Sequence, residues 1–202
     1  MEKAWATRNP VHAHQHAVQF YGNEDALFTT VAGFLGEGLV AGQPGVLIAT
    51  EPHNGAILEH LGARFIDVER ATRVGDLVVL DADHTLAAFM KDNELDPARF
   101  RRHVGDVIGQ ALGGRVRTPV RAYGEIVDVL WRQNKPNAAI RLEMLWNELA
   151  TTHALSLLCG YSMGNFYKQA QQFEEICAQH THVITPEQKM IPFERRTVSR
   201  VT

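Results

Sequence analysis

The first strand–loop–helix segment of the chain has the layout of a phosphate-binding site, but its residues do not suit phosphate. A strand-like run over residues 16–21 leads into a polar loop over 22–25 and then into a helical pattern. A phosphate-binding loop here would read Gly-x-x-x-x-Gly-Lys-[Ser/Thr], so that backbone N–H groups and a lysine hold the phosphates. The loop instead carries Glu24 and Asp25, and none of the five lysines in the chain follows a glycine. Because adjacent carboxylates repel a triphosphate, the sequence argues against ATP hydrolysis at this place.

Polar side chains also follow the other strand-like runs. In open α/β sheets, ligands bind beyond the carboxyl ends of the strands, so these residues are expected to converge on one rim. As single residues, Asp81 or Asp83 would also serve as a helix cap, and Glu51 as a solvated loop acid. The predicted ligand-binding residues are His16, Tyr21, Asn23, Thr50, Glu51, Asp81, Asp83, Tyr123, Glu125 and Tyr161, with His53 and His84 beside them.

The acid with the most informative position is Glu125, directly after an apolar run at 120–124. Without a lysine to hold phosphates, a role in handling a metal–nucleotide complex is not favoured. A carboxylate is stabilised at the positive end of a helix, so Glu125 is expected to start one or to bond Arg121 or Arg141. Glu143 and Glu148 are five residues apart and do not form a pair of catalytic carboxylates.

The histidines raise a metal hypothesis. His12, His14 and His16 alternate, so an extended segment would place them on one side, and His180 and His182 could join them. Imidazole suits zinc, copper or nickel. These residues lie at the two ends of the domain, however, and no cysteine or carboxylate spacing completes a recognised site. No metal, no cofactor and no catalytic residue are therefore predicted.

Neither cysteine has the setting of a nucleophile. Cys159 lies in an apolar strand pattern and Cys177 in a helical one, which favours reduced, buried thiols over a disulfide. No Gly-x-Ser-x-Gly elbow and no Gly-x-Gly-x-x-Gly dinucleotide fingerprint occurs.

Apolar runs that alternate with helical patterns predict an α/β fold with a mostly parallel central sheet flanked by helices. The domain is expected over 16–182, with a polar arm at 1–15 and a mobile tail at 183–202. Strands are predicted at 16–21, 46–49, 65–68, 74–81, 120–124 and 155–161, and helices at 24–41, 53–61, 84–91, 97–112, 125–133, 137–151 and 164–181.

Composition narrows the class of protein. The chain has 202 residues, 45% of them hydrophobic and 21% charged, which is ordinary for a globular domain. A net charge of −3 gives no basic field for nucleic acid or an anionic membrane. No apolar run reaches the length of a membrane helix, and the N-terminus does not resemble a signal peptide. A cytoplasmic location is expected.

Several blocks of residues, in order along the chain, resemble the MEDS domain, the sensory domain named for methanogens, methylotrophs and the regulator DcmR. The resemblance covers about 16–163 and implies a three-layer RecA/KaiC-like fold whose P-loop has been lost. The matching blocks are 16–21 with 34–42 and 46–50, 80–83 with 89–90, 121–125 with 130–131, 142–148, and 157–161.

The resemblance implies a domain that senses a small molecule, such as a hydrocarbon derivative, and signals through another protein, a histidine kinase or a transcription regulator. Trp131, Trp146 and the last helix could supply the partner surface, although buried core is the commoner place for tryptophan. The alternatives are an adaptor with a vestigial pocket and, less favoured, a nucleotide-dependent enzyme. Because loss of the P-loop removes the main reason for a RecA-like ring, a monomer or a homodimer is as compatible with the sequence as a hexamer.

Overall fold

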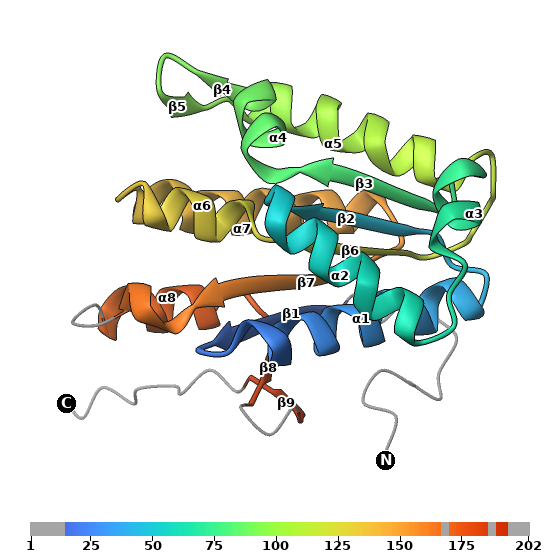
Figure 1. The fold of residues 1–202 in the computed structure, drawn as a ribbon. Coiled ribbons are helices and arrows are strands. Elements are labelled where there is room, and N and C mark those ends of the chain that lie inside the picture. The colour runs from blue at the N-terminus through green and yellow to red at the C-terminus, as the bar shows by residue number, and fades with distance from the viewer. Residues whose placement is uncertain (1–14, 167–169, 186–188, 194–202) are drawn as a thin grey trace.

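A seven-stranded sheet forms the centre of the protein, as seen in a computed structural model that describes residues 15–166, 170–185 and 189–193. Its strands run in the order β3-β2-β6-β7-β1-β8-β9, and every neighbouring pair is parallel except β8 and β9. The prediction of an α/β fold with a mostly parallel sheet is confirmed (Figure 1). The strands of this sheet are β1 (Gln15–Tyr21), β2 (Gly45–Ala49), β3 (Leu77–Asp81), β6 (Val120–Gly124), β7 (Leu155–Ser162), β8 (His182–Ile184) and β9 (Met190–Pro192).

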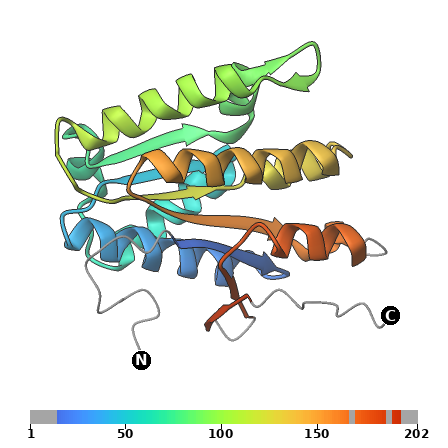
Figure 2. The same cartoon turned by 180° about the vertical axis from the view of Figure 1, so that it is seen from behind.

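Helices cover both faces of the sheet. The helices α1 and α2 pack on one face, and α4, α5, α6 and α7 pack on the other, as Figures 1 and 2 show from the two sides. Each face has its own apolar core, because alternate side chains of a strand point to opposite faces. The helices are α1 (Glu24–Val40), α2 (Glu51–Ala63), α3 (Val68–Arg73), α4 (Ala82–Phe89), α5 (Pro97–Leu112), α6 (Ile126–Arg132), α7 (Pro136–Thr152) and α8 (Ala170–Cys177), with a 3-10 turn at Met163–Phe166.

Local sequence explains the helix starts at the carboxyl ends of the strands. The Asn23 side chain accepts hydrogen bonds from the N–H groups of Asp25 and Ala26, and Asp96 caps α5, where Pro97 takes the first position. Such caps satisfy N–H groups that have no partner inside the helix. They also fix where each loop at this end of the sheet turns into its helix.

Two short elements between β2 and α5 were predicted wrongly or missed. Residues 65–68 were expected to form a strand, but Phe65 is 97% exposed with a φ of 63°, and a helix, α3, begins at Val68. The left-handed turn there ends α2 instead of extending the chain. A small hairpin of β4 (Met90–Lys91) and β5 (Glu94–Leu95) turns at Asp92 and Asn93, which both have positive φ.

The C-terminal part of the sheet extends past the predicted domain boundary. The last helix, expected at 164–181, is α8 and ends at Cys177, and the chain then re-enters the sheet as β8 beside β1. The segment 183–202 was predicted as a tail, yet β9 and the last two residues of β8 lie within it. Both strands are three residues long, which is too short to show the alternation of apolar and polar residues that identifies a strand in a sequence. The expected arm at 1–15 lies almost entirely outside the described residues.

The order of the strands creates a switch point between β2 and β6. These strands are neighbours, but β2 leads into α2 on one face and β6 leads into α6 on the other. In open α/β sheets, such a divergence of connections is where ligands bind. The fold therefore singles out the carboxyl ends of β2 and β6, together with the nearby end of β1.

Candidate functional site

The centre of the rim is Glu125, the residue that joins β6 to α6 across the switch point. Its side chain is only 1% exposed. One carboxylate oxygen accepts the Thr50 N–H at 2.5 Å, which links the end of β2 to the end of β6. The other lies 2.7 Å from the His53 Nδ1 atom and 3.3 Å from the Tyr123 hydroxyl, which donates to it. Glu125 was expected to start a helix or to bond Arg121 or Arg141. It does start a helix, as the N-cap residue of α6. It bonds neither arginine, because Arg121 turns to Gln43 and the Phe34 carbonyl, and Arg141 is exposed.

The first turn of α2 supplies the histidine that continues this chain of contacts toward the surface. His53 Nε2 lies 3.6 Å from a Glu24 oxygen in the first turn of α1, where Glu24 is 66% exposed. The imidazole ring packs edge-on against Phe28 and Tyr21. A line of ionisable groups, Glu125, His53 and Glu24, therefore runs from the buried switch point to the loop between β1 and α1.

The environment favours the charged form of both groups in the His53–Glu125 pair. The hydrogen bond with Glu125 raises the pKa of His53, an effect that burial only partly opposes. Burial alone would raise the pKa of Glu125, but the hydrogen bonds from His53 and from the Thr50 N–H outweigh it and lower that pKa. Both shifts favour an imidazolium–carboxylate pair, and the pair is largely withdrawn from water. Perturbed pairs of this kind cluster at functional sites.

This pair predicts a window of pH in which it stabilises the fold. The raised His53 pKa adds stability that is complete below the unfolded value of 6.5 and lost as pH rises through the folded pKa. The lowered Glu125 pKa adds stability that is present above the unfolded value of 4.5 and lost as pH falls through the folded pKa. Urea unfolding of the wild type and of His53→Gln should therefore differ most between those two values, by about 1.5–3 kcal/mol for a charge-assisted bond. Other histidines cancel in that difference, and a difference that does not change with pH would contradict the assignment.

A second buried acid lies at the same rim, beside the end of β1. Asp128 on α6 accepts the Ser162 N–H at 3.0 Å and lies 3.2 Å from the Arg132 Nε atom. Burial, followed by the charges of Asp128 and Glu125, raises the pKa of Tyr21. Acidic groups thus surround the place where a phosphate would sit in a P-loop protein.

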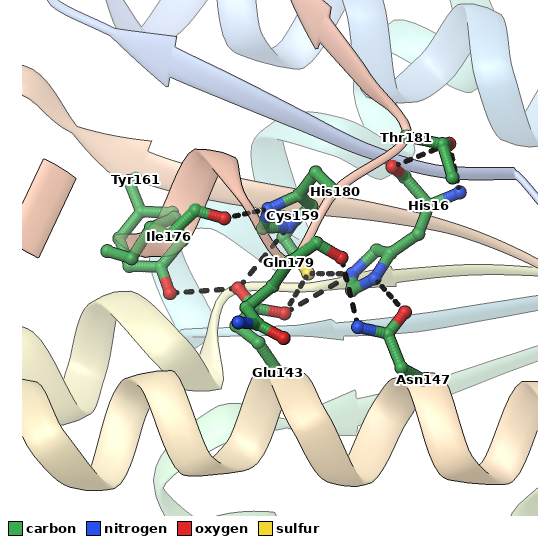
Figure 3. Close-up of polar contacts among 9 residues, drawn as sticks. All are labelled: His16, Glu143, Asn147, Cys159, Tyr161, Ile176, Gln179, His180 and Thr181. Atoms are coloured by element: carbon green, nitrogen blue, oxygen red, sulfur yellow. Dashed lines mark hydrogen bonds and ion pairs between the residues drawn. The ribbon is translucent and has the colours of Figure 1, made fainter. Parts of the chain in front are cut away.

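The predicted rim residues divide into three groups. Tyr21, Thr50, Tyr123 and Glu125 come together with His53. A second group lies at the starts of helices: Asn23 and Asp81 cap α1 and α4, and Glu51, Asp83 and His84 are exposed. The third group, His16 and Tyr161, points to the other face of the sheet and lies in a different cluster (Figure 3).

That cluster contains the residue that sequence reasoning missed. Glu143 on α7 is fully buried; it accepts the Tyr161 hydroxyl at 2.8 Å and lies 3.2 Å from His16 Nε2. A signal was available, since Glu143 falls four residues after Ala139 and three before Trp146, on the apolar stripe of its helix. A charged residue on such a stripe is informative because it must be paired in the core.

The structure brings together two of the histidines that the metal hypothesis named. His180 does join His16, as the metal hypothesis suggested, whereas His12 and His14 lie outside the described residues. The Thr181 hydroxyl lies 2.8 Å from Nδ1 of His182, which is in β8.

Trp131 and Trp146 are 5% and 3% exposed, so they belong to the core and cannot supply a partner surface. No described helix is long and apolar enough to cross a membrane.

Comparison with solved structures places the fold in the KaiC-like class. A KaiC-like protein from Pyrococcus horikoshii OT3 is similar over 84% of this chain and 69% of its own, with a TM-score of 0.55 and 12% identity. At that identity the likeness shows the fold alone. The family model of the MEDS domain, the methanogen/methylotroph, DcmR sensory domain, matches residues 15–181, and the chain belongs to that family. No curated protein matches the sequence.

Proposed function

We propose that the protein is a non-catalytic sensory domain that binds a small neutral or cationic molecule at the rim around His53 and Glu125. The observation that supports this most is the buried His53–Glu125 pair at the switch point between β2 and β6. A charged pair withdrawn from water gives little net stability over apolar residues of the same size, because desolvation offsets its attraction, although removing one partner is costly. Its position at the usual ligand site of an open α/β sheet points instead to binding.

The charges at the rim define the class of ligand. Glu24, Glu125 and Asp128 face the end of β1, and the nearest cations, His53 and Arg132, are already paired with them. A neutral or cationic molecule with hydrogen-bond donors matches this field, and Tyr21 and Phe28 offer apolar contact beside it. A triphosphate does not match it, which supports the inference that the P-loop of a KaiC-like ancestor has been lost.

Thermal unfolding tests this function. Small neutral and cationic organic molecules are expected to stabilise the protein, by about 2.7 kcal/mol at a hundredfold excess over Kd, whereas Mg-ATP should not shift the midpoint. Glu125→Gln should abolish the stabilisation by a hit, and Glu51→Gln, which changes an exposed acid at the start of α2, should keep it. A clear shift with Mg-ATP that Glu125→Gln removes would overturn the proposal.

A specific observation also supports the adaptor alternative. Large apolar side chains are exposed in the connections at the opposite, amino edge of the sheet: Val40 and Val116 are 80% and 82% exposed, Phe65 97% and Val74 51%. Exposed apolar surface of this kind marks protein contacts. Output to a signalling partner would use this edge. Failure of every ligand in the screen, with partner binding that Phe65→Ser abolishes, would favour the adaptor over the sensor.

A further inference from the structure

The buried cluster on the α7 face of the sheet brings together four side chains that are metal ligands in proteins. His16 comes from β1, Cys159 from β7, Glu143 from α7, and His180 from the turn between α8 and β8 (Figure 3). All four are buried, and one ligand atom from each lies within 4.8 Å of those of the others. None of the four takes part in the rim site, which involves the other face of the sheet.

Both histidines are oriented by hydrogen bonds at the nitrogen that faces away from the centre. His16 Nδ1 lies 2.9 Å from the Asn147 Oδ1 atom, and the Asn147 amide is itself fixed because its Nδ2 donates to the Gln179 carbonyl. His180 Nδ1 lies 2.7 Å from the Ile176 carbonyl. A carbonyl can only accept, so each Nδ1 carries a proton, and each Nε2 faces the centre, where it presents a lone pair when the ring is neutral. Metal-binding histidines are oriented in this way by their outer partners.

The centre of the cluster lacks a hydrogen bond that the core would normally supply. His180 Nε2 is buried and makes no hydrogen bond, although it lies 3.4 Å from a Glu143 oxygen. A lone pair on nitrogen and a carboxylate oxygen repel each other unless a cation or a proton lies between them. Buried polar atoms without a partner are rare, and an ion bound at the site is one of their ordinary explanations.

The spacing of three of the four ligand atoms fits a tetrahedral ion, and the fourth, His180 Nε2, lies within 4.8 Å of the others. His16 Nε2 lies 3.2 Å from Glu143 Oε2 and 3.4 Å from Cys159 Sγ, and that sulfur lies 3.3 Å from the same oxygen. Zinc bonds of about 2.0–2.3 Å in tetrahedral geometry separate neighbouring ligand atoms by roughly 3.3–3.7 Å. We propose that His16, Glu143, Cys159 and His180 form a closed, structural Zn²⁺ site.

Charge and ligand type select the ion. With a thiolate, a carboxylate and two neutral imidazoles, a divalent cation brings the buried site to a net charge of zero, which removes the cost of an unpaired buried charge. The Cys159 thiol gives up its proton to solvent as the metal–sulfur bond forms. Two nitrogens, one sulfur and one oxygen suit Zn²⁺, whereas Mg²⁺ and Ca²⁺ require oxygen ligands. The Tyr161 hydroxyl, which donates to Glu143, orients the carboxylate from outside.

The site would tie the C-terminal segment to the core. Three ligands lie on β1, β7 and α7, and the fourth, His180, immediately precedes Thr181, which exchanges hydrogen bonds with the His16 backbone. Metal binding would therefore fix the turn that leads into β8. Loss of the metal is expected to loosen α8 and β8 before the rest of the sheet.

Metal analysis of the full chain tests the site. Protein purified without chelators should contain about one zinc per chain, since a four-ligand structural site binds one ion. His180→Ala and Cys159→Ser should lose it. The matched controls, His182→Ala two residues further on and Cys177→Ser at the other buried cysteine, should retain it. A strong chelator should lower the unfolding midpoint of the wild type and of both controls.

Cobalt replacement in the wild-type protein gives a readout that does not depend on whether a variant folds. Co²⁺ added to the metal-free chain should give intense tetrahedral ligand-field bands and a thiolate-to-cobalt charge-transfer band, and Zn²⁺ should displace both. The proposal would be overturned by protein that contains no zinc as purified, is equally stable with and without chelator, and gives no charge-transfer band with Co²⁺. The cluster would then be a buried imidazolium–carboxylate–thiol network. Neither result depends on ligand binding at the rim.

Discussion

Replacing Glu143 by alanine is expected to lower the free energy of unfolding by about 3–5 kcal/mol, the cost of removing one member of a buried charged set. The carboxylate is fully buried, accepts the Tyr161 hydroxyl and lies beside His16 and His180. Its loss leaves these groups without their common partner and also opens a void in the core. Chemical denaturation of the two proteins, with and without added zinc, measures the difference.

The same helix offers a matched control. Glu148 is half exposed and forms a surface ion pair with Arg101 at 2.8 Å. Glu148→Ala removes the same number of atoms, but exposed ion pairs contribute little, so its cost should stay below about 1 kcal/mol. Equal costs for the two variants would show that Glu143 does not hold the β1, β7 and α7 segments together.

Replacing Glu125 by alanine should have the second largest effect, about 2–5 kcal/mol. The change leaves at least two inward-facing donors without an acceptor, the Thr50 N–H and the Tyr123 hydroxyl, each costing about 1–3 kcal/mol when unsatisfied. His53 would also lose the carboxylate that raises its pKa. Denaturant titration should show a large fall in the midpoint.

Two further variants separate the contributions at Glu125. Glu125→Gln keeps an acceptor for the Thr50 N–H and should cost less than the alanine variant, while it removes the charge that pairs with His53. Glu51→Ala, in the exposed first turn of α2, should change stability by no more than about 0.5 kcal/mol. A full loss of stability in Glu125→Gln would mean that the charge, and not the hydrogen bonds, holds the switch point.

The fold was predictable because its main signals are local. Continuous apolar runs such as Val46–Ala49 indicate a buried parallel strand, and caps such as Asn23 and Asp96 mark where helices begin. The matching MEDS blocks supplied the family. The strands β8 and β9 were not predictable, since three residues carry no period, and their pairing beside β1 depends on contacts from the distant N-terminal part of the sheet.

The sites were predictable only in part, because the sequence shows which end of a strand a residue occupies more readily than which face it takes. Tyr123 and Tyr161 both lie near strand ends, but they point to opposite faces and belong to separate cores. The hydrogen bond between Glu125 and His53 spans 72 positions, and the Glu143 cluster joins residues up to 164 positions apart, from His16 to His180. No spacing rule covers such separations.

Amide NMR of the nitrogen-15-labelled protein shows directly whether the rim binds a small molecule instead of a nucleotide. Spectra would be recorded with Mg-ATP and with the strongest hit of the thermal screen. We expect the hit to shift the amide signals of Thr50, Glu125 and Ser162 saturably, and Mg-ATP to leave those of Gly22 and Asn23 unchanged. Saturable shifts of Gly22 and Asn23 with Mg-ATP, and none at the rim with the hit, would contradict this expectation.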